Sequence, residues 1–425
     1  MRSPNSTSAV ARSAAAQARV VVADDDELIL RSLRRLLRDK TSEWDLLFTT
    51  DADTAARGLD EVGVRVLVSD FRMKVGNGTK LLEVARERHP EVARIVLSGD
   101  ATADAALHLV PAAHQFLAKP FEPDRLRATL ERVCALPALL KNESLRAVIG
   151  RDNDLPSSPS VHDALSRALA KSKTSLAEIA AIAERDVGIA AQLLRLASSP
   201  VFGPPRAAAT IQDSVAALGL DTLRNLVRQS HVIAPFRVAP ALAHFSPESL
   251  SVHAVATARL ARELLDARSD ADDAFTAGLL HNVGQFVLAS RVPHRFAEAL
   301  DGTSRMRALL ETERELMGFT HAAVGAYLLG LWGIRPAVVD AVLHHGAPHR
   351  TDDDANVATA VHVAAVLAKN PEAPVVEDAT ETTEATQTTE AMTALPAAYL
   401  ERLRVRERLP RLRELATRLR ATAES

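Results

Sequence analysis

Short, uninterrupted apolar runs alternate with segments of helical periodicity in the first part of the chain. Runs such as VVVA (20–23) and VLVS (66–69) are typical of strands buried on both faces. The segments between them, such as ELILRSLRRLLRD and GTKLLEVARERH, place apolar residues at helical spacing. Because strands of this kind need helices on both sides, residues 19–136 are predicted to form five βα units. The expected fold is α/β, a doubly wound five-stranded parallel sheet.

A second region follows in which we find only helical periodicity. Residues 137–160, which include the polar, proline-containing stretch RDNDLPSSPS, are predicted to be a linker. Beyond it, patterns such as SLAEIAAIAERDVGIAAQLLRLA recur, and Ser175 and Glu178 have the spacing of a helix capping box. Residues 161–370 are therefore predicted to form a separate all-α domain.

Three remaining segments do not have the pattern of a domain core. Residues 1–18 contain no apolar stretch of the length that a secretory signal requires and are predicted to be a disordered leader. Residues 371–393 are a Thr/Glu-rich tract with too little apolar surface to fold, so a disordered loop is expected. Residues 394–425 are predicted to form an arginine-rich amphipathic helix, interrupted at Pro410, that docks its leucine stripe on the α-domain or presents a basic face to a partner.

Composition restricts the classes of partner. The net charge of −3 produces no overall attraction to nucleic acid or anionic lipid, and the 4% of aromatic residues argue against a base-stacking surface. No apolar run approaches the length of a membrane span, which is roughly 20 residues. We therefore expect a cytoplasmic protein that does not bind membranes. Nucleic acid is not expected to be a partner.

Polar residues end four of the five predicted strands. The first strand ends in Asp24-Asp25, the third in Asp70, the fourth in Ser98 and the fifth in Lys119. Because ligands of parallel sheets bind at the carboxyl ends of the strands, these side chains are expected to share one site. Clustered carboxylates repel one another, and Mg²⁺ held by Asp24, Asp25 and Asp70 would remove that penalty. A carboxylate can also accept a phosphoryl group, so the site predicts phosphotransfer to Asp70.

Each of these residues alone has a structural explanation, since strand-end Asp and Ser cap helices and Lys-Pro forms turns. Together they make the first domain resemble the receiver domain of two-component response regulators. The resemblance includes the spacings of 45 residues from Asp25 to Asp70, 28 on to Ser98, and 49 from Asp70 to Lys119. It implies a flavodoxin-like fold, a Mg²⁺ cofactor and a sensor histidine kinase as partner. It also implies that Ser98 and Lys119 contact the phosphoryl group and that Phe116 is the switch aromatic.

Phosphorylation would add close to two negative charges at the edge of the sheet. Ser98 and Lys119 would move inward, and Phe116 would repack against the neighbouring face, which offers a route to a phosphorylation-dependent homodimer. One departure from the family pattern is Lys74, where many receivers have proline. The loop that follows, Val75 to Gly78, leaves the rate of phosphorylation open.

Histidines in the second domain follow part of a metal-site pattern. In HD hydrolases the metal is held by a first histidine, a His-Asp doublet and a later aspartate. Here Asn282 replaces the doublet aspartate and Ala365 replaces the later one, so two anionic ligands are missing. Lone buried histidines are commonly hydrogen-bonded core residues, and we expect a structural role. The degenerate site is predicted to comprise His253, His281, Asn282, His344, His345 and Ala365.

The whole second domain resembles the HDOD domain, a relative of the HD hydrolases. The resemblance rests on DVGIAAQLLRLASSPVFG, TIQDSVAALGLDTLRNLV, AFTAGLLHNVGQFVL and THAAVGAYLLGLWGIRPAVVDAVLHH. It implies a non-catalytic signalling output that binds an unidentified downstream protein, with no cofactor in this domain. Two alternatives remain open. One is a metal-dependent phosphohydrolase, with a cyclic dinucleotide as a candidate substrate, and the other is a DNA-binding regulator, for which no basic helix-turn-helix is evident.

Overall fold

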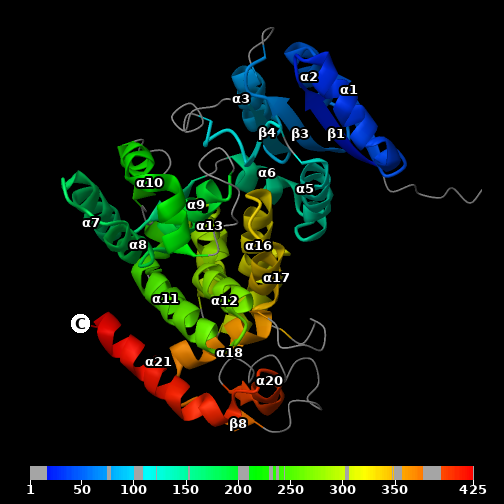
Figure 1. Ribbon diagram of the computed structural model, residues 1–425. Coiled ribbons are helices and arrows are strands. Elements are labelled where there is room, and N and C mark those ends of the chain that lie inside the picture. The colour runs from blue at the N-terminus through cyan, green and yellow to red at the C-terminus, as the bar shows by residue number, and fades with distance from the viewer. Residues whose placement is uncertain are drawn as a thin grey trace, which may run out of the picture.

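The computed structural model describes most of the chain and shows two folded regions in contact (Figure 1). The described residues are 17–73, 78–99, 109–120, 122–151, 154–199, 210–228, 233–235, 239–243, 245–301, 306–346, 348, 357–376 and 394–424. No helix among them is both long enough and apolar enough to cross a membrane.

The first region is a five-stranded parallel sheet with the strand order β2-β1-β3-β4-β5. The predicted fold class is therefore confirmed. The helix predicted between β4 and β5 falls outside the described residues. The strands are β1 (Ala18–Ala23), β2 (Trp44–Thr49), β3 (Val64–Asp70), β4 (Ala93–Ser98) and β5 (Gln115–Ala118), and the helices are α1 (Glu27–Leu36), α2 (Ala52–Leu59), α3 (Gly78–Arg88) and α5 (Pro123–Ala135).

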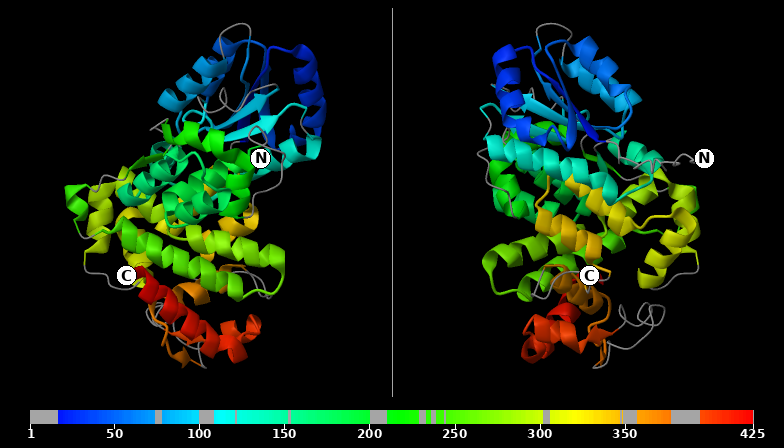
Figure 2. Two further views of the ribbon diagram at one scale, coloured as in Figure 1. Left: turned by 60° about the vertical axis from the view of Figure 1, so that its left-hand side comes forward. Right: turned by 90° about the vertical axis from the view of Figure 1, so that its right-hand side faces the viewer.

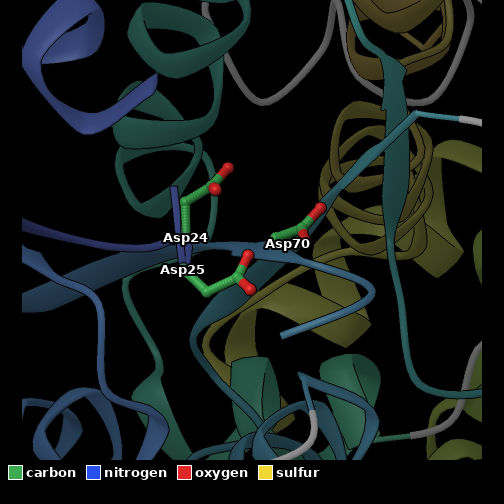
Figure 3. Close-up of side chains that lie close together, drawn as sticks. All are labelled: Asp24, Asp25 and Asp70. Carbon is green, nitrogen blue, oxygen red and sulfur yellow. The ribbon is translucent and has the colours of Figure 1, made fainter. Parts of the chain in front are cut away.

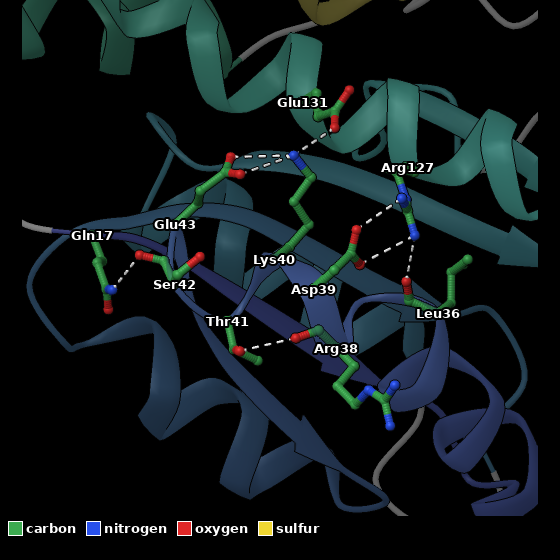
Figure 4. A network of polar contacts seen from close by, with 10 residues as sticks. All are labelled: Gln17, Leu36, Arg38, Asp39, Lys40, Thr41, Ser42, Glu43, Arg127 and Glu131. Atoms are coloured by element: carbon green, nitrogen blue, oxygen red, sulfur yellow. Dashed lines mark hydrogen bonds and ion pairs between the residues drawn. The ribbon is translucent and has the colours of Figure 1, made fainter.

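The two faces of this sheet are covered by different helices, as a doubly wound fold requires. Helix α2 packs against α3, whereas α5 is bonded to the segment that follows α1. Figure 4 shows that second connection: Arg127 of α5 binds the carboxylate of Asp39, and Lys40 forms an ion pair with Glu131. The turn between β1 and α1 is set by Asp26, whose side chain accepts a hydrogen bond from the backbone N–H of Leu28.

The second region is mainly helical (Figure 2). Its helices are α6 (Glu143–Arg151), α7 (Pro159–Ala170), α8 (Leu176–Ala183), α9 (Val187–Ala197), α10 (Ile211–Arg228), α11 (Pro247–Glu263), α12 (Arg268–Leu280), α13 (Val283–Arg291), α14 (Pro293–Leu300), α15 (Met306–Met317), α16 (His321–Leu331), α17 (Pro336–His344) and α18 (Val357–Lys369). As the capping box predicts, the Ser175 hydroxyl accepts a hydrogen bond from the N–H of Glu178 at the start of α8.

Two predictions for this region need correction. The linker predicted at 137–160 contains the helix α6, because Leu145 and Ile149 bury an apolar face against the rest of the protein. The α-domain also contains a short parallel pair of strands, β6 (Leu155–Ser157) and β7 (Ile233–Pro235). Strands of three residues are too short to leave a periodic pattern in the sequence, so helical periodicity alone could not reveal them.

The terminal segments also differ in part from expectation. Ala18 belongs to β1 because it pairs with Trp44, while residues 1–16 of the predicted leader lie outside the described residues. Of the predicted Thr/Glu loop, residues 377–393 are likewise outside them. Strand β8 (Val375–Val376) lies at its start and pairs with β9 (Leu395–Pro396).

The C-terminal segment forms two helices, α20 (Ala397–Arg402) and α21 (Leu409–Glu424), joined by a 3-10 turn. The break lies before residue 409, where Arg404 has a positive φ of 54°, and not at Pro410. Pro410 stands in the first turn of α21, where a missing N–H costs nothing. As predicted, the apolar stripe of α21 docks on the α-domain: Leu412 and Ala416 are buried, and the helix packs on α11 and α18.

Candidate functional site

Three carboxylates meet at the carboxyl edge of the parallel sheet. Asp24 and Asp25 follow β1, and Asp70 ends β3, the neighbouring strand, so the topology brings them together (Figure 3). One oxygen atom from each lies within 4.8 Å of the others. Asp24 is fully buried, and Asp70 is 7% exposed. This arrangement of hard oxygen ligands fits a divalent cation such as Mg²⁺.

Lys119 is bonded to two of the three carboxylates in this cluster. Its Nζ donates to Oδ2 of Asp24 at 2.6 Å and to Oδ1 of Asp70 at 2.8 Å. Burial raises the pKa of Asp24, and the bond from Lys119 opposes that effect only in part. Burial by itself lowers the pKa of Lys119, but the bonds to Asp24 and Asp70 outweigh it, and the lysine pKa is raised.

Ser98 and Phe116 flank the acidic cluster on the next two strands. Ser98 ends β4 and is 2% exposed, and its hydroxyl has no hydrogen-bond partner among the described residues. The backbone N–H of Lys119 donates to the carbonyl of Ser98 at 2.6 Å, which ties the ends of β4 and β5 together. Phe116 is buried on β5 and lines a small cavity together with Arg195 and Trp332 of the helical region.

The geometry suits transfer of a phosphoryl group to a carboxylate. Asp70 is 7% exposed, and its carboxylate lies beside the ammonium group of Lys119. On the neighbouring strand, the hydroxyl of Ser98 has no hydrogen-bond partner among the described residues. An ammonium and a hydroxyl are the groups that stabilise phosphoryl oxygens. The sequence-predicted residues Asp24, Asp25, Asp70 and Lys119 are all brought together here. The loop residues 74–77, which include Lys74, lie outside the described part of the chain.

A second group of side chains is a chain of imidazoles inside the helical region. The ring centroids of His253 and His281 are 5.4 Å apart, those of His281 and His345 are 5.2 Å apart, and those of His321 and His345 are 5.6 Å apart. Burial, followed by the charges of neighbouring histidines, lowers the pKa of His345 to about 3. Burial lowers the pKa of His253 to about 4. His253 and His345 are therefore neutral at physiological pH.

Three rings of this histidine chain are each held through Nδ1 by a specific partner, which for His345 is the carbonyl of Val342 at 2.8 Å. His281 donates from Nδ1 to the carbonyl of Gly278 at 2.6 Å, and its Nε2 accepts a bond from the Asn282 amide at 2.8 Å. His321 binds the buried carboxylate of Glu313 through Nδ1 at 2.9 Å. Glu313 was not identified from the sequence, where nothing marks it as a partner of a histidine eight residues away.

The histidine chain differs from the predicted degenerate site in its membership. His344 lies beside the carboxylate of Asp340 at 3.1 Å, and the chain includes His321, which is not among the predicted site residues. Ala365 is buried in α18, which packs on α11 and α12, the helices before His281. In the described part of the chain, the acidic cluster alone brings three metal-ligating atoms within 4.8 Å of one another. The described imidazole nitrogens do not meet this distance criterion.

The two regions are joined by buried polar contacts that sequence reasoning did not reveal. Arg195 of α9 is 3% exposed and donates to the carbonyls of Val110 and Ala113, each at 2.6 Å. Its guanidinium also lies over the ring of Trp332, 5.1 Å from the centroid. On β5, Gln115 donates to the carbonyl of Leu331 at 2.9 Å. The face that includes β5 is therefore covered by the helical region.

Comparison with known proteins agrees with this division. Residues 20–131 match the response regulator receiver domain, and residues 155–348 match the HDOD domain. The hydrogenase transcriptional regulatory protein HoxA of Cupriavidus necator is 36% identical over 118 residues, 27% of this chain and 24% of that protein. An uncharacterized protein of Treponema pallidum is 27% identical over 214 residues, 49% of this chain and 40% of that protein. This chain thus spans less than half of either relative.

Among solved structures, the MmoQ response regulator of Methylococcus capsulatus is similar, with 22% identity, a TM-score of 0.45, and coverage of 61% of this chain and 98% of that one. The sheet topology and the acidic cluster define a receiver-type signalling protein. With both domain matches, the chain belongs to the response regulators, as one that pairs a receiver domain with an HDOD domain.

Proposed function

We propose that Asp70 accepts a phosphoryl group from a sensor histidine kinase in the cytoplasm and that the HDOD domain is a non-catalytic output that binds a downstream protein. The observation that carries the proposal is the pair of bonds from Lys119 to Asp24 and Asp70 within the acidic cluster. A carboxylate oxygen of Asp70 attacks phosphorus, and the bond from phosphorus to the donor nitrogen breaks with its electron pair leaving on the donor.

Mg²⁺ is the proposed cofactor of this reaction. Asp24, Asp25 and Asp70 would hold it, and the ion would neutralise the charge that gathers on the phosphoryl oxygens. Lys119 would then bind the phosphoryl group once it is on Asp70, and Ser98 would offer its hydroxyl to another phosphoryl oxygen. No Mg²⁺ is proposed for the HDOD domain.

Contacts between the domains support the HDOD domain as the receiver's output. Phe116 and Gln115 lie on the strand that ends beside Lys119, and this strand contacts the helical region. A movement of Lys119 on phosphorylation would therefore be transmitted to the HDOD domain through the strand β5. The signal would be a shift between two packings of this interface, as in other two-state switches.

The non-catalytic assignment is supported by the residue that replaces aspartate in the doublet. The amide of Asn282 donates to Nε2 of His281, and Gln285 donates in turn to Asn282. The Nε2 lone pair of His281, which would bind a metal, is thus used in a protein hydrogen bond. Asparagine also brings no negative charge to a hard cation.

The decisive experiment is phosphorylation of the full chain with acetyl phosphate and Mg²⁺. We expect one hydroxylamine-labile phosphoryl group, because amines attack acyl phosphates, and no label in Asp70→Asn. Asp26→Ser is a matched control, since serine can still cap α1 and the carboxylate lost is not one of the three in the cluster. Full labelling of Asp70→Asn would refute Asp70 as the acceptor, and equal labelling with and without Mg²⁺ would refute the proposed cofactor.

A further inference from the structure

The helix α3 begins in contact with the main chain of Asp70. A Cβ atom added at Gly78, the first residue of this helix, would overlap the carbonyl oxygen of Asp70 and lie 3.0 Å from that of Phe71. Gly78 is buried, and it is not among the glycines with a positive φ, so its backbone conformation does not call for glycine. The requirement is space, because only a residue without a Cβ atom lets the helix lie this close to Asp70.

The strand side of this contact is fixed by hydrogen bonds. Asp70 pairs with Leu97 of β4, and the N–H of Phe71 donates to the carbonyl of Leu97 at 3.2 Å. The carbonyl oxygen of Asp70 accepts a further hydrogen bond, at 3.0 Å, from the hydroxyl of Ser69, which is fully buried. The oxygen atom that Gly78 approaches is therefore also held from within the strand.

The helix side of the contact is fixed by packing. Leu81, Leu82 and Ala85 of α3 are each at most 2% exposed. The same helix packs against α2 and α6. Because protein interiors are close-packed, α3 cannot move away from a larger residue at position 78 without opening space along this buried face. A side chain at this position would therefore displace the main chain of Asp70, the start of α3 or both.

We propose that Gly78 and Ser69 are positioning residues for phosphoryl transfer and that they act through the carbonyl group of Asp70. The inference rests on the proposed function, in which the Asp70 carboxylate attacks phosphorus and helps to hold Mg²⁺. The reacting side chain and the fixed carbonyl group belong to the same residue, so a shift of one moves the other. A displacement of about 1 Å can cost about a hundredfold in rate, so a small shift of this main chain is enough to slow the transfer.

Gly78→Ala tests the contact with the helix. In the full chain with acetyl phosphate, we expect the phosphorylation rate per folded molecule to fall at least about tenfold. Titration calorimetry should also show weaker Mg²⁺ binding, because one of the three carboxylates is displaced. Loss of stability alone would change neither quantity in the folded molecules, whose fraction is measured by circular dichroism.

Gly188→Ala is the matched control. A Cβ atom at Gly188, in α9 of the HDOD domain, would overlap the carbonyl oxygen of Pro156 and lie 3.0 Å from its carbonyl carbon. The substitution therefore introduces the same kind of clash, between a helix and a backbone carbonyl, away from the acidic cluster. We expect it to lower the melting temperature while the phosphorylation rate and the Mg²⁺ affinity stay at the parent's values.

Ser69→Ala tests the second contact and decides the matter if Gly78→Ala does not fold. It removes the hydrogen bond to the Asp70 carbonyl without adding an atom, and we expect a rate that is several-fold lower than the parent's. Ser214→Ala is its control, since the fully buried hydroxyl of Ser214 donates to the carbonyl of Thr210 at 2.9 Å in the HDOD domain. This control should keep the parent's rate.

A parent-like rate or a parent-like Mg²⁺ affinity in folded Gly78→Ala overturns the inference. A parent-like rate in Ser69→Ala, or a rate in Gly188→Ala as slow as that of Gly78→Ala, also overturns it. In each of these outcomes Asp70→Asn still loses its label, so the proposed function stands. Absence of label on the parent chain, by contrast, refutes the proposed function and this inference with it.

Discussion

The Nζ atom of Lys119 lies 2.8 Å from Oδ1 of Asp70, across 49 residues of sequence. The same atom binds the buried carboxylate of Asp24, so the lysine is held in place by a group that does not accept the phosphoryl group in our proposal. Its ammonium is therefore positioned before the reaction begins. Such preorganised charge is worth far more in a partly buried site than in water.

Lys119→Met should reduce the rate of phosphorylation by acetyl phosphate by about a hundredfold, because the charge is lost while the apolar stem is kept. The rate is measured with labelled donor on protein shown by circular dichroism to be folded. Lys40→Met is the matched control, since Lys40 pairs with Glu43 and Glu131 on another face of the sheet. An unchanged rate in Lys119→Met would show that the lysine has no part in the transfer.

Arg195→Met should destabilise the contact between the domains by about 2–4 kcal/mol, since the carbonyls of Val110 and Ala113 lose a charged donor and stay buried. Burial, followed by repulsion from Arg94, lowers the pKa of Arg195 to about 9, so the group still carries its charge at neutral pH. We expect calorimetry to resolve separate transitions for the receiver and HDOD domains in this variant. A single transition at the parent's temperature would contradict the role of Arg195 in joining them.

Acid should destabilise the HDOD domain through its neutral histidines. The folded-state pKa values of His253 and His345, about 4 and about 3, lie below the ordinary value of 6.5, so the unfolded chain binds protons more tightly. Stability is therefore fully present above pH 6.5 and is lost as the pH falls toward 4 and then 3. Each histidine contributes a slope of about 1.4 kcal/mol per pH unit in this window.

Urea unfolding at a series of pH values measures this slope. His345→Gln should make it shallower, since one group that takes up a proton on unfolding is gone, although the variant is expected to be less stable at neutral pH. His162→Gln, at a partly buried position outside the histidine chain, is a control for the loss of any histidine. A slope that is unchanged in His345→Gln would rule out His345 as a source of the acid sensitivity.

Restoring the missing anionic residues tests the non-catalytic assignment. The double variant Asn282→Asp and Ala365→Asp should bind Mn²⁺ or Zn²⁺ at least about tenfold more tightly than the parent, because carboxylates replace a neutral amide and a methyl group. Titration calorimetry measures the affinity, and Asn370→Asp is a control for added charge near the end of α18. If the parent purifies with stoichiometric metal in the HDOD domain and hydrolyses phosphoesters, the non-catalytic assignment fails.

Much of the receiver site could be predicted from sequence because the geometry of parallel sheets is regular. Apolar runs mark buried strands, and the carboxyl ends of such strands lie at one edge of a sheet. Asp24 and Asp70 could therefore be placed together although 46 residues separate them. The HDOD helices were evident from their periodicity for a similar reason, since helical spacing is a local property of the chain.

The sequence by itself determined the fold class, the acidic cluster and the neutral side chains at positions 282 and 365, since each depends on residue type and local pattern. Only the tertiary structure decided that α6 joins the core, that the ring of His321 lies beside that of His345, and that Glu313 binds His321. It also decided that Arg195 reaches the carbonyls of Val110 and Ala113. These contacts join side chains to backbone or to distant helices, and neither periodicity nor spacing encodes which surfaces of two packed elements face each other.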